Sequence, residues 1–176
     1  MASNLKSRSL KRLLYFSIFF SDVDRGSILS LIHSNFERNT SKLHAEYRVD
    51  EIDFFKADSL NPKLEEDLKD VNLIICADVV YNADITRAFF KTLKHLSKLT
   101  TKESLSVFIS LEKRLWMDLD GEIIAPSYEV FLECLHELEE NQPNVHIEEI
   151  PIDFPNIFQQ FYDRVSNLVI WEIKIS

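Results

Sequence analysis

Apolar residues gather in short blocks along the chain, and polar residues separate the blocks. Mainly apolar runs over 13–20, 71–77 and 105–111 are typical of strands that lie inside a sheet. A less regular pattern predicts three more strands, at 47–55, 145–152 and 168–175. The 71–77 run is almost wholly apolar, so we expect this strand to be covered on both faces, near the middle of the sheet.

Helical spacing of apolar residues alternates with these strands. Apolar positions predict a helix through Ile28 and Phe36, and Asn61-Pro62 predicts the start of a short second helix. Two longer helices are predicted by apolar stripes at Ile85, Ala88, Phe89, Leu93, Leu96 and Leu99 and at Tyr128, Phe131, Leu132, Leu135 and Leu138. This alternation indicates a doubly wound, mostly parallel α/β sheet. No clear helix separates the last two strands, so we expect the last strand to be antiparallel.

A basic segment, residues 1–12, precedes the first apolar run. It holds Lys6, Arg8, Lys11 and Arg12 and no acid, like the start of a signal peptide. The apolar run after it has only eight residues and no cleavage pattern of small residues, so a strand is the better interpretation. We therefore expect one domain, 13–176, behind a basic segment, and no membrane contact.

Glycine is scarce in this sequence. The chain holds 2, Gly26 and Gly121, where an average usage of about 7% would give about a dozen. A phosphate-binding loop needs several glycines close together, because only glycine lets the backbone approach a ligand so tightly. The formal net charge of −9 repels nucleic acid and favours cationic partners. The scarcity of glycine argues against a glycine-rich phosphate-binding loop. The negative charge argues against direct binding of nucleic acid.

Cysteine and histidine usage gives no sign of a metal site. Cys76 and Cys134 each lie inside an apolar segment, and the five histidines are scattered without ligand spacing. Two buried free thiols are typical of a reducing compartment, so we expect a soluble intracellular protein.

Acidic residues follow several of the predicted strands. Asp22 comes after the first apolar run, Asp53-Phe54 closes the second strand, and Asp78 and Tyr81 follow 71–77. Ligands of doubly wound sheets bind beyond the carboxyl ends of the strands. There Asp22 could accept hydrogen bonds from a ribose diol, and Asp53-Phe54 could hold a purine. Asp78 and Tyr81 could orient a cationic amine, although any one of these acids could equally be a helix cap.

These segments resemble a known family when they are taken in order. FFSDVD, HSNFERN, VDEIDFF, IICADVVYN, TRAFFKTL, VFISLEKR and SYEVFLECLHELE are similar to segments of the class I, seven-β-strand S-adenosylmethionine-dependent methyltransferases. More narrowly, the D-x-x-Y of Asp78 and Tyr81 resembles the signature of the family 16 protein-lysine methyltransferases. The resemblance runs from about residue 19 to residue 175.

The resemblance implies a fold, a co-substrate and roles for individual residues. It implies a Rossmann-like methyltransferase fold that uses S-adenosylmethionine to methylate lysine in a protein substrate, in the nucleus or the cytoplasm. Asp22 matches the acid that binds the ribose, and Asp53-Phe54 matches the pair beside the adenine, where Phe stands in place of the usual Trp. Ala77 matches the residue whose backbone faces the co-substrate. Asp78 and Tyr81 match the catalytic pair that places the target lysine.

The sequence departs from the family at its beginning. The first strand of the family, with its E-x-G-x-G-x-G loop, has no counterpart here, because the 13–20 run matches the second strand. We therefore expect an N-terminally incomplete methyltransferase domain with little or no activity on its own.

Two other classes of protein stay open. One is a non-catalytic protein-interaction module derived from the methyltransferase fold. The other is a phospho-acceptor receiver domain with Asp22, Asp24 and Asp78 as its acidic pocket, which the spacing of the strands disfavours.

Overall fold

A computed structural model describes residues 17–42, 45–153, 155 and 165–176 of the chain. It divides into two compact units, Met1–Asp53 and Phe54–Ser176, each of which is described here by itself. The predicted basic segment, 1–12, lies outside the described residues. The single domain from 13 to 176 stays a prediction.

The N-terminal unit is one strand–helix–strand motif. Strand β1 (Ser17–Asp22) pairs in parallel with β2 (Glu46–Glu51), in a register that runs from Ser17 opposite Glu46 to Asp22 opposite Glu51. Helix α2 (Ile28–Asn39) and a 3-10 turn (Thr40–Lys42) connect the strands, as a crossover between parallel strands requires. The ring of Phe36 contacts both strands, with its centroid 4.2 Å from Phe20 and 4.6 Å from Tyr47. The predicted helix is confirmed; the first part of the predicted 13–20 strand lies outside the described residues.

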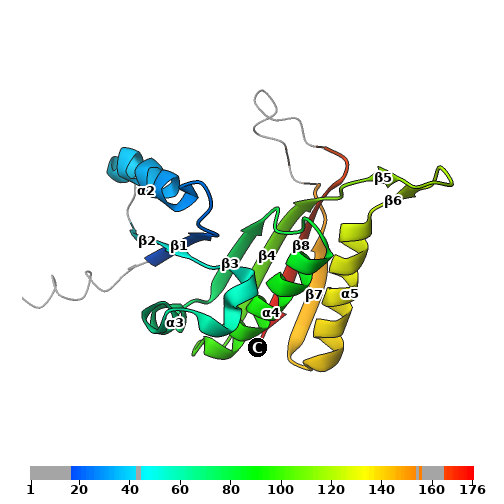
Figure 1. The fold of residues 1–176 in the computed structure, drawn as a ribbon. Coiled ribbons are helices and arrows are strands. Elements are labelled where there is room, and N and C mark those ends of the chain that lie inside the picture. Colours follow the sequence, from blue (N-terminus) through cyan, green and yellow to red (C-terminus); the bar gives the residue numbers. More distant parts are fainter. Residues whose placement is uncertain (1–16, 43–44, 154, 156–164) are drawn as a thin grey trace, which may run out of the picture. The chain divides into compact units, whose positions relative to one another are not determined.

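The C-terminal unit contains a four-stranded sheet in the order β3-β4-β8-β7 (Figure 1). Its strands are β3 (Leu73–Ala77), β4 (Leu105–Glu112), β7 (Val145–Ile150) and β8 (Leu168–Ile175). Strands β3 and β4 are parallel, and β8 runs antiparallel to both β4 and β7. Strand β8, the last strand, therefore runs in the opposite direction to the other three strands of the sheet. This confirms the predicted mixed α/β sheet, mostly parallel with an antiparallel last strand.

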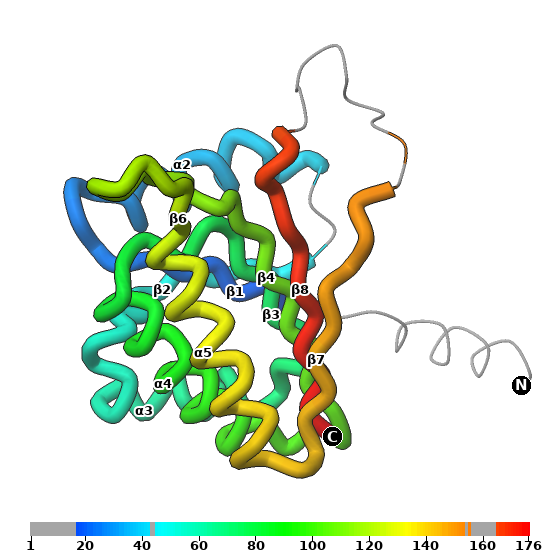
Figure 2. Tube along the Cα trace, turned by 90° about the vertical axis from the view of Figure 1, so that its right-hand side faces the viewer, coloured from blue at the N-terminus to red at the C-terminus, as the bar shows by residue number. Residues whose placement is uncertain are grey.

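Two long helices cover one face of this sheet. They are α4 (Ala83–Leu99) and α5 (Pro126–Asn141), which pack side by side, as Figures 1 and 2 show. Asn82 caps α4, because its side-chain Oδ1 accepts a hydrogen bond from the amide of Ile85 at 2.9 Å. The core lies between these helices and the sheet. Its fully buried apolar side chains are Leu93, Leu105, Val107, Ile109, Phe131 and Ile173.

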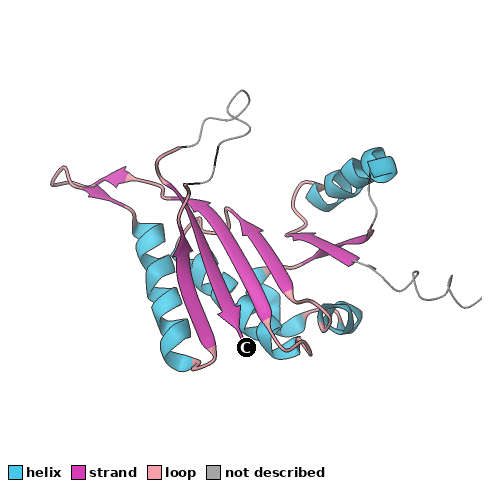
Figure 3. Ribbon diagram, turned by 180° about the vertical axis from the view of Figure 1, so that it is seen from behind, coloured by secondary structure: helices cyan, strands magenta, loops and turns pink. Residues whose placement is uncertain are grey.

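Strand β3 departs from the sequence prediction. Its inward residues Ile74 and Cys76 pack on the core, but Leu73 and Ile75, which point to the other face, are 50% and 75% exposed. Figure 3 views the sheet from the side of this face, with the strands in front of α4 and α5. The prediction that both faces of this strand are covered is wrong for the described C-terminal unit, because α4 and α5 lie on the opposite face of the sheet.

Shorter elements fill the connections. The Asn61-Pro62 prediction is confirmed by α3 (Pro62–Leu68), where Asn61 Oδ1 accepts from the amide of Lys63 at 2.9 Å. The predicted strand 47–55 ends early, at Glu51, and a 3-10 helix (Phe54–Ser59) follows it. A hairpin of β5 (Trp116–Met117) and β6 (Ile123–Ile124) was not predicted. No helix in the described ranges is both long and apolar enough to span a membrane.

Candidate functional site

The carboxyl ends of β3 and β4 meet at Asp78. The amide of Asp78 donates to the carbonyl of Ser110 on β4 at 2.8 Å, which continues the parallel pairing by one residue. At Asp78 the backbone turns into the left-handed region, with a φ of 50°. Asp and Asn tolerate this conformation better than other side chains with a Cβ. Such residues cluster at functional sites, so the turn marks Asp78 as a candidate.

Asp78 and Tyr81 are linked through one cation, Arg114. Its guanidinium Nη2 donates to Asp78 Oδ2 at 2.9 Å, and its Cζ lies 4.7 Å from the centroid of the Tyr81 ring. The side chains of Asp78 and Arg114 are about half exposed. The other carboxylate oxygen, Asp78 Oδ1, is buried and has no hydrogen-bond partner among the described residues. A buried acceptor of this kind calls for a functional explanation, such as a donor on a ligand or substrate.

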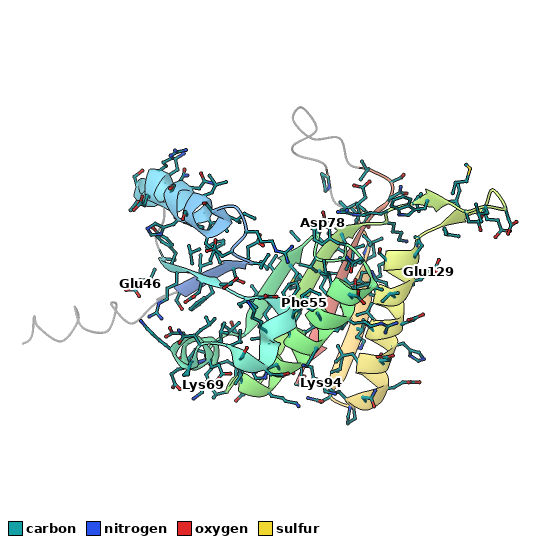
Figure 4. The ribbon with its side chains drawn as sticks, in the orientation of Figure 1. Glu46, Phe55, Lys69, Asp78, Lys94 and Glu129 are labelled. Carbon is teal, nitrogen blue, oxygen red and sulfur yellow. The ribbon has the colours of Figure 1, made fainter. Side chains whose placement is uncertain are left out.

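Helix α5 fixes the backbone of Tyr81. Ser127, in the first turn of α5, donates from its hydroxyl to the carbonyl of Tyr81 at 3.1 Å. Beside it, the ammonium of Lys113 lies 4.5 Å from the centroid of the Tyr128 ring. Tyr81 is about half exposed, and Arg114 lies over one face of its ring. Figure 4 shows the labelled Asp78 at this end of the sheet, beyond the labelled Phe55 and Lys94 of the lower elements.

The N-terminal unit places a second group of acids at the ends of β1 and β2. Asp22 Oδ1 accepts from the amide of Val23 at 2.7 Å, and Glu51 Oε1 accepts from the amide of Asp24 at 3.1 Å. Asp22 is exposed and lies opposite Glu51 in the register. Glu51 was missed in the sequence, because the second strand was expected to run on to residue 55. Ending the strand four residues earlier would have identified it.

Phe54 has a packing role of its own. Its ring contacts Phe89 of α4 edge-on, with 5.3 Å between centroids, and its carbonyl accepts from the hydroxyl of buried Thr92 at 3.2 Å. Asp53 is the last residue of the N-terminal unit, and Ala77 is the exposed end of β3. Of the predicted residues, the structure brings Asp78 and Tyr81 together around Arg114. Arg114 ends the VFISLEKR segment that resembles the family, but no pattern in the sequence distinguished this arginine from its neighbours.

The thiol of Cys76 lies two residues before Asp78. Cys76 and Cys134 are free, and burial raises the pKa of both thiols, that of Cys76 to about 12. Within the described ranges, no three His, Cys, Asp or Glu side chains gather closely enough to hold a metal ion.

The raised pKa predicts slow alkylation of Cys76. Only the thiolate reacts, and an ordinary thiol is ionised above about pH 8.5. In the native chain Cys76 is expected to stay protonated through pH 9 and to react with iodoacetamide at least about tenfold more slowly than after denaturation. Peptide mapping of the alkylated chain measures this difference. Equal rates in native and denatured protein would contradict the burial of the thiol.

Comparison with known proteins identifies the family. The family model described as lysine methyltransferase matches residues 9–137, so the chain belongs to this methyltransferase family. The resemblance drawn from the strand-end motifs is thereby confirmed.

Two individual proteins of known name are similar to most of this chain. The chain is similar to Methyltransferase-like protein 22 of Homo sapiens, with 30% identity over 175 residues, covering 89% of this chain and 42% of that protein. The protein of the same name from Mus musculus is 28% identical over 143 residues, covering 73% and 35%. The chain thus spans less than half the length of these relatives. Among solved structures, precorrin 8w decarboxylase from Methanobacterium thermoautotrophicum has a TM-score of 0.45 at 14% identity, covering 91% of this chain and 69% of that chain, too loose a likeness for any inference.

Proposed function

We propose that this chain is part of an S-adenosylmethionine-dependent protein-lysine methyltransferase and carries its lysine-binding residues. The observation that carries the proposal is the cluster of Asp78, Tyr81 and Arg114. A carboxylate and an aromatic face already hold one cation there, in a chain of the lysine methyltransferase family. A lysine side chain carries the same charge and suits the same two groups. The substrate is accordingly a protein, and a basic one, because the chain has a net charge of −9.

Several of the residues present offer groups that suit the methyl donor, while the E-x-G-x-G-x-G loop of the family has no counterpart in the sequence. Asp22 is an exposed carboxylate that can accept from two ribose hydroxyls, and Asp53 with Phe54 offers an acceptor and a ring edge for an adenine. The co-substrate would supply an activated methyl group, which the protein has only to align with the amine nitrogen. Ala77 would present its backbone beside it.

The chain's own residues then act on the lysine. The ammonium, with a pKa of about 10.4, must lose its proton before its nitrogen can accept a methyl group. Asp78 attracts and orients the cationic side chain, and the Tyr81 ring forms a wall that keeps it in line. The proton leaves to water, since the cluster is half exposed. No residue needs to form a covalent bond to the substrate.

Lysine binding in this cluster requires that Arg114 give way. An ion pair this exposed contributes only about 0–1 kcal/mol, and the contact with Tyr81 adds about 0.5–1 kcal/mol. A substrate lysine can therefore displace Arg114 at small cost. Arg114 would hold Asp78 in place while the substrate is absent.

Arg114→Gln is expected to lower the KM for a lysine peptide by up to about fivefold, because the competing cation is gone. The kcat should stay within about twofold, since Asp78 and Tyr81 remain. Steady-state kinetics measures both quantities. Arg87→Gln is the matched control, because Arg87 donates to Glu133 at the same 2.9 Å in an exposed pair on α4 and α5. A raised KM in Arg114→Gln would mean that the arginine assists lysine binding and does not compete with it.

Methyl transfer tests the proposed function directly. The chain is incubated with S-adenosylmethionine labelled in its methyl group and a mixture of lysine peptides, or the same peptides with every Lys replaced by Arg. A low level of label is expected, and in the lysine peptides alone. Label in the arginine peptides would contradict lysine specificity.

A second candidate function is a non-catalytic interaction module built on the methyltransferase fold. The exposed apolar side chains of the β5–β6 hairpin favour it, because surfaces of this kind bind other proteins. It is the better account if no peptide is labelled and calorimetry detects no S-adenosylmethionine binding.

A further inference from the structure

The segment between β4 and α5 forms a small, well-closed hairpin. Strands β5 and β6 pair antiparallel, with Trp116 opposite Ile124 and Met117 opposite Ile123. Asp118 closes the tip, because its Oδ1 accepts from the amides of Asp120 at 3.0 Å and Glu122 at 2.8 Å. Figure 1 shows the hairpin extending past the ends of β4 and α5, away from the sheet. Its side chains are therefore displayed on a formed element.

Large apolar side chains cover this hairpin and are exposed. Leu119 at the tip is fully exposed, Met117 and Ile123 are 75% and 70% exposed, and Leu115 and Trp116 are about half to two-thirds exposed. Because alternate strand residues point to opposite faces, Met117 and Ile123 share one face and Trp116 the other. None of these five belongs to the core of the C-terminal unit. Exposed large apolar side chains on both faces of one small hairpin, outside the core, mark it as a binding element.

The charges on the hairpin select the kind of partner. Three acids, Asp118, Asp120 and Glu122, lie among the apolar residues, and residues 115–125 contain no Lys or Arg. Asp118 is engaged in the turn, while Asp120 and Glu122 are exposed. An occupant that complements this surface combines apolar side chains with basic ones.

The hairpin is attached directly to the candidate lysine site. It begins two residues after Arg114, which holds Asp78 and covers Tyr81. We propose that the β5–β6 hairpin is the surface on which the protein substrate docks, through a segment beside the target lysine that is both basic and apolar. This inference rests on the proposed function and adds the chemistry of the partner.

A peptide of defined composition tests the docking surface. The probe is a short fluorescent peptide in which one central lysine is flanked by alternating Leu and Arg, and its affinity is measured by fluorescence anisotropy. Leu119→Ser is expected to weaken binding roughly tenfold, as for a residue central to an interface. Leu31→Ser on α2, where the side chain is 59% exposed, is the matched control and should bind within about twofold of the unaltered chain.

Two further measurements make the assignment specific. Replacing Leu by Ser or Arg by Glu in the peptide should each weaken binding about tenfold, because each removes one half of the complementarity. Bound peptide should also shield the exposed Trp116 from acrylamide quenching. Equal binding by Leu119→Ser, or no binding by the unaltered chain, overturns the docking proposal.

The outcomes separate docking from catalysis. If Leu119→Ser weakens peptide binding but no methyl group is ever transferred, the hairpin is a docking surface and the proposed function fails. If methyl transfer to the peptide proceeds with the same KM in Leu119→Ser as in the unaltered chain, the proposed function stands and the docking proposal fails.

Discussion

Asp78→Asn is expected to lower the rate of lysine methylation by about 100-fold or more. The change removes the charge that orients the lysine, and misplacement of a reacting group by about 1 Å already costs about that factor. Asn is a better choice than Ala, because it keeps the shape of the side chain and tolerates the left-handed backbone at this position. Initial rates with saturating S-adenosylmethionine measure the loss.

A matched control separates this effect from a general change of charge. Asp58→Asn also removes an exposed carboxylate, one that is paired with Lys91, and it should leave the rate within about twofold. Both variants should bind S-adenosylmethionine with the affinity of the unaltered chain in calorimetry. An Asp78→Asn chain that methylates lysine at the normal rate would remove Asp78 from the site.

Phe131→Ala is expected to destabilise the C-terminal unit by about 3–5 kcal/mol. Phe131 is fully buried, and its ring lies 5.7 Å from Phe90, 5.9 Å from Tyr128 and 6.1 Å from Trp171, measured between centroids. It therefore joins α4, α5 and β8, and its removal leaves a cavity where these elements meet. Denaturation in urea followed by circular dichroism measures the loss.

The adjacent Leu132 supplies the control for that measurement. It is on the same helix but 38% exposed, so Leu132→Ala should cost about 1 kcal/mol or less. The same loss in both variants would show that the helix, and not the ring cluster, determines the stability. Since Tyr128 and Ser127 link α5 to the candidate site, Phe131→Ala should also weaken lysine methylation at temperatures where the chain remains folded.

The spacing of apolar residues was sufficient to predict the elements whose apolar side chains mostly pack on the core. The predicted strand at 105–111 is β4, and the two long apolar stripes lie on α4 and α5. Burial in the core stabilises the apolar residues of these elements, so their spacing follows the period of the strand or helix. The spacing was not sufficient for β3. Apolar residues occur on both faces of that strand, so the sequence could not indicate that Leu73 and Ile75 would lie on the face opposite α4 and α5 and be exposed.

The site could be predicted only in part, because it contains residues that lie far apart in the sequence. Asp78 and Tyr81 were identified from the end of one strand, but Arg114 enters the site because β3 and β4 are parallel neighbours whose carboxyl ends meet. That pairing cannot be read from local spacing. The hairpin escaped notice because its strands have two residues each, too short for a period to be recognised.

The most direct test of the account follows Arg114 itself. A chain with isotope-labelled arginine side chains is titrated with N-acetyl-lysine methylamide, and the guanidinium signals are observed by NMR. The account predicts that the Arg114 signal moves toward that of a free arginine as lysine binds, and that Asp78→Asn abolishes the response. An Arg114 signal that stays unchanged at saturating lysine, like that of Arg87, would contradict the assignment of Asp78 and Tyr81 as the lysine site.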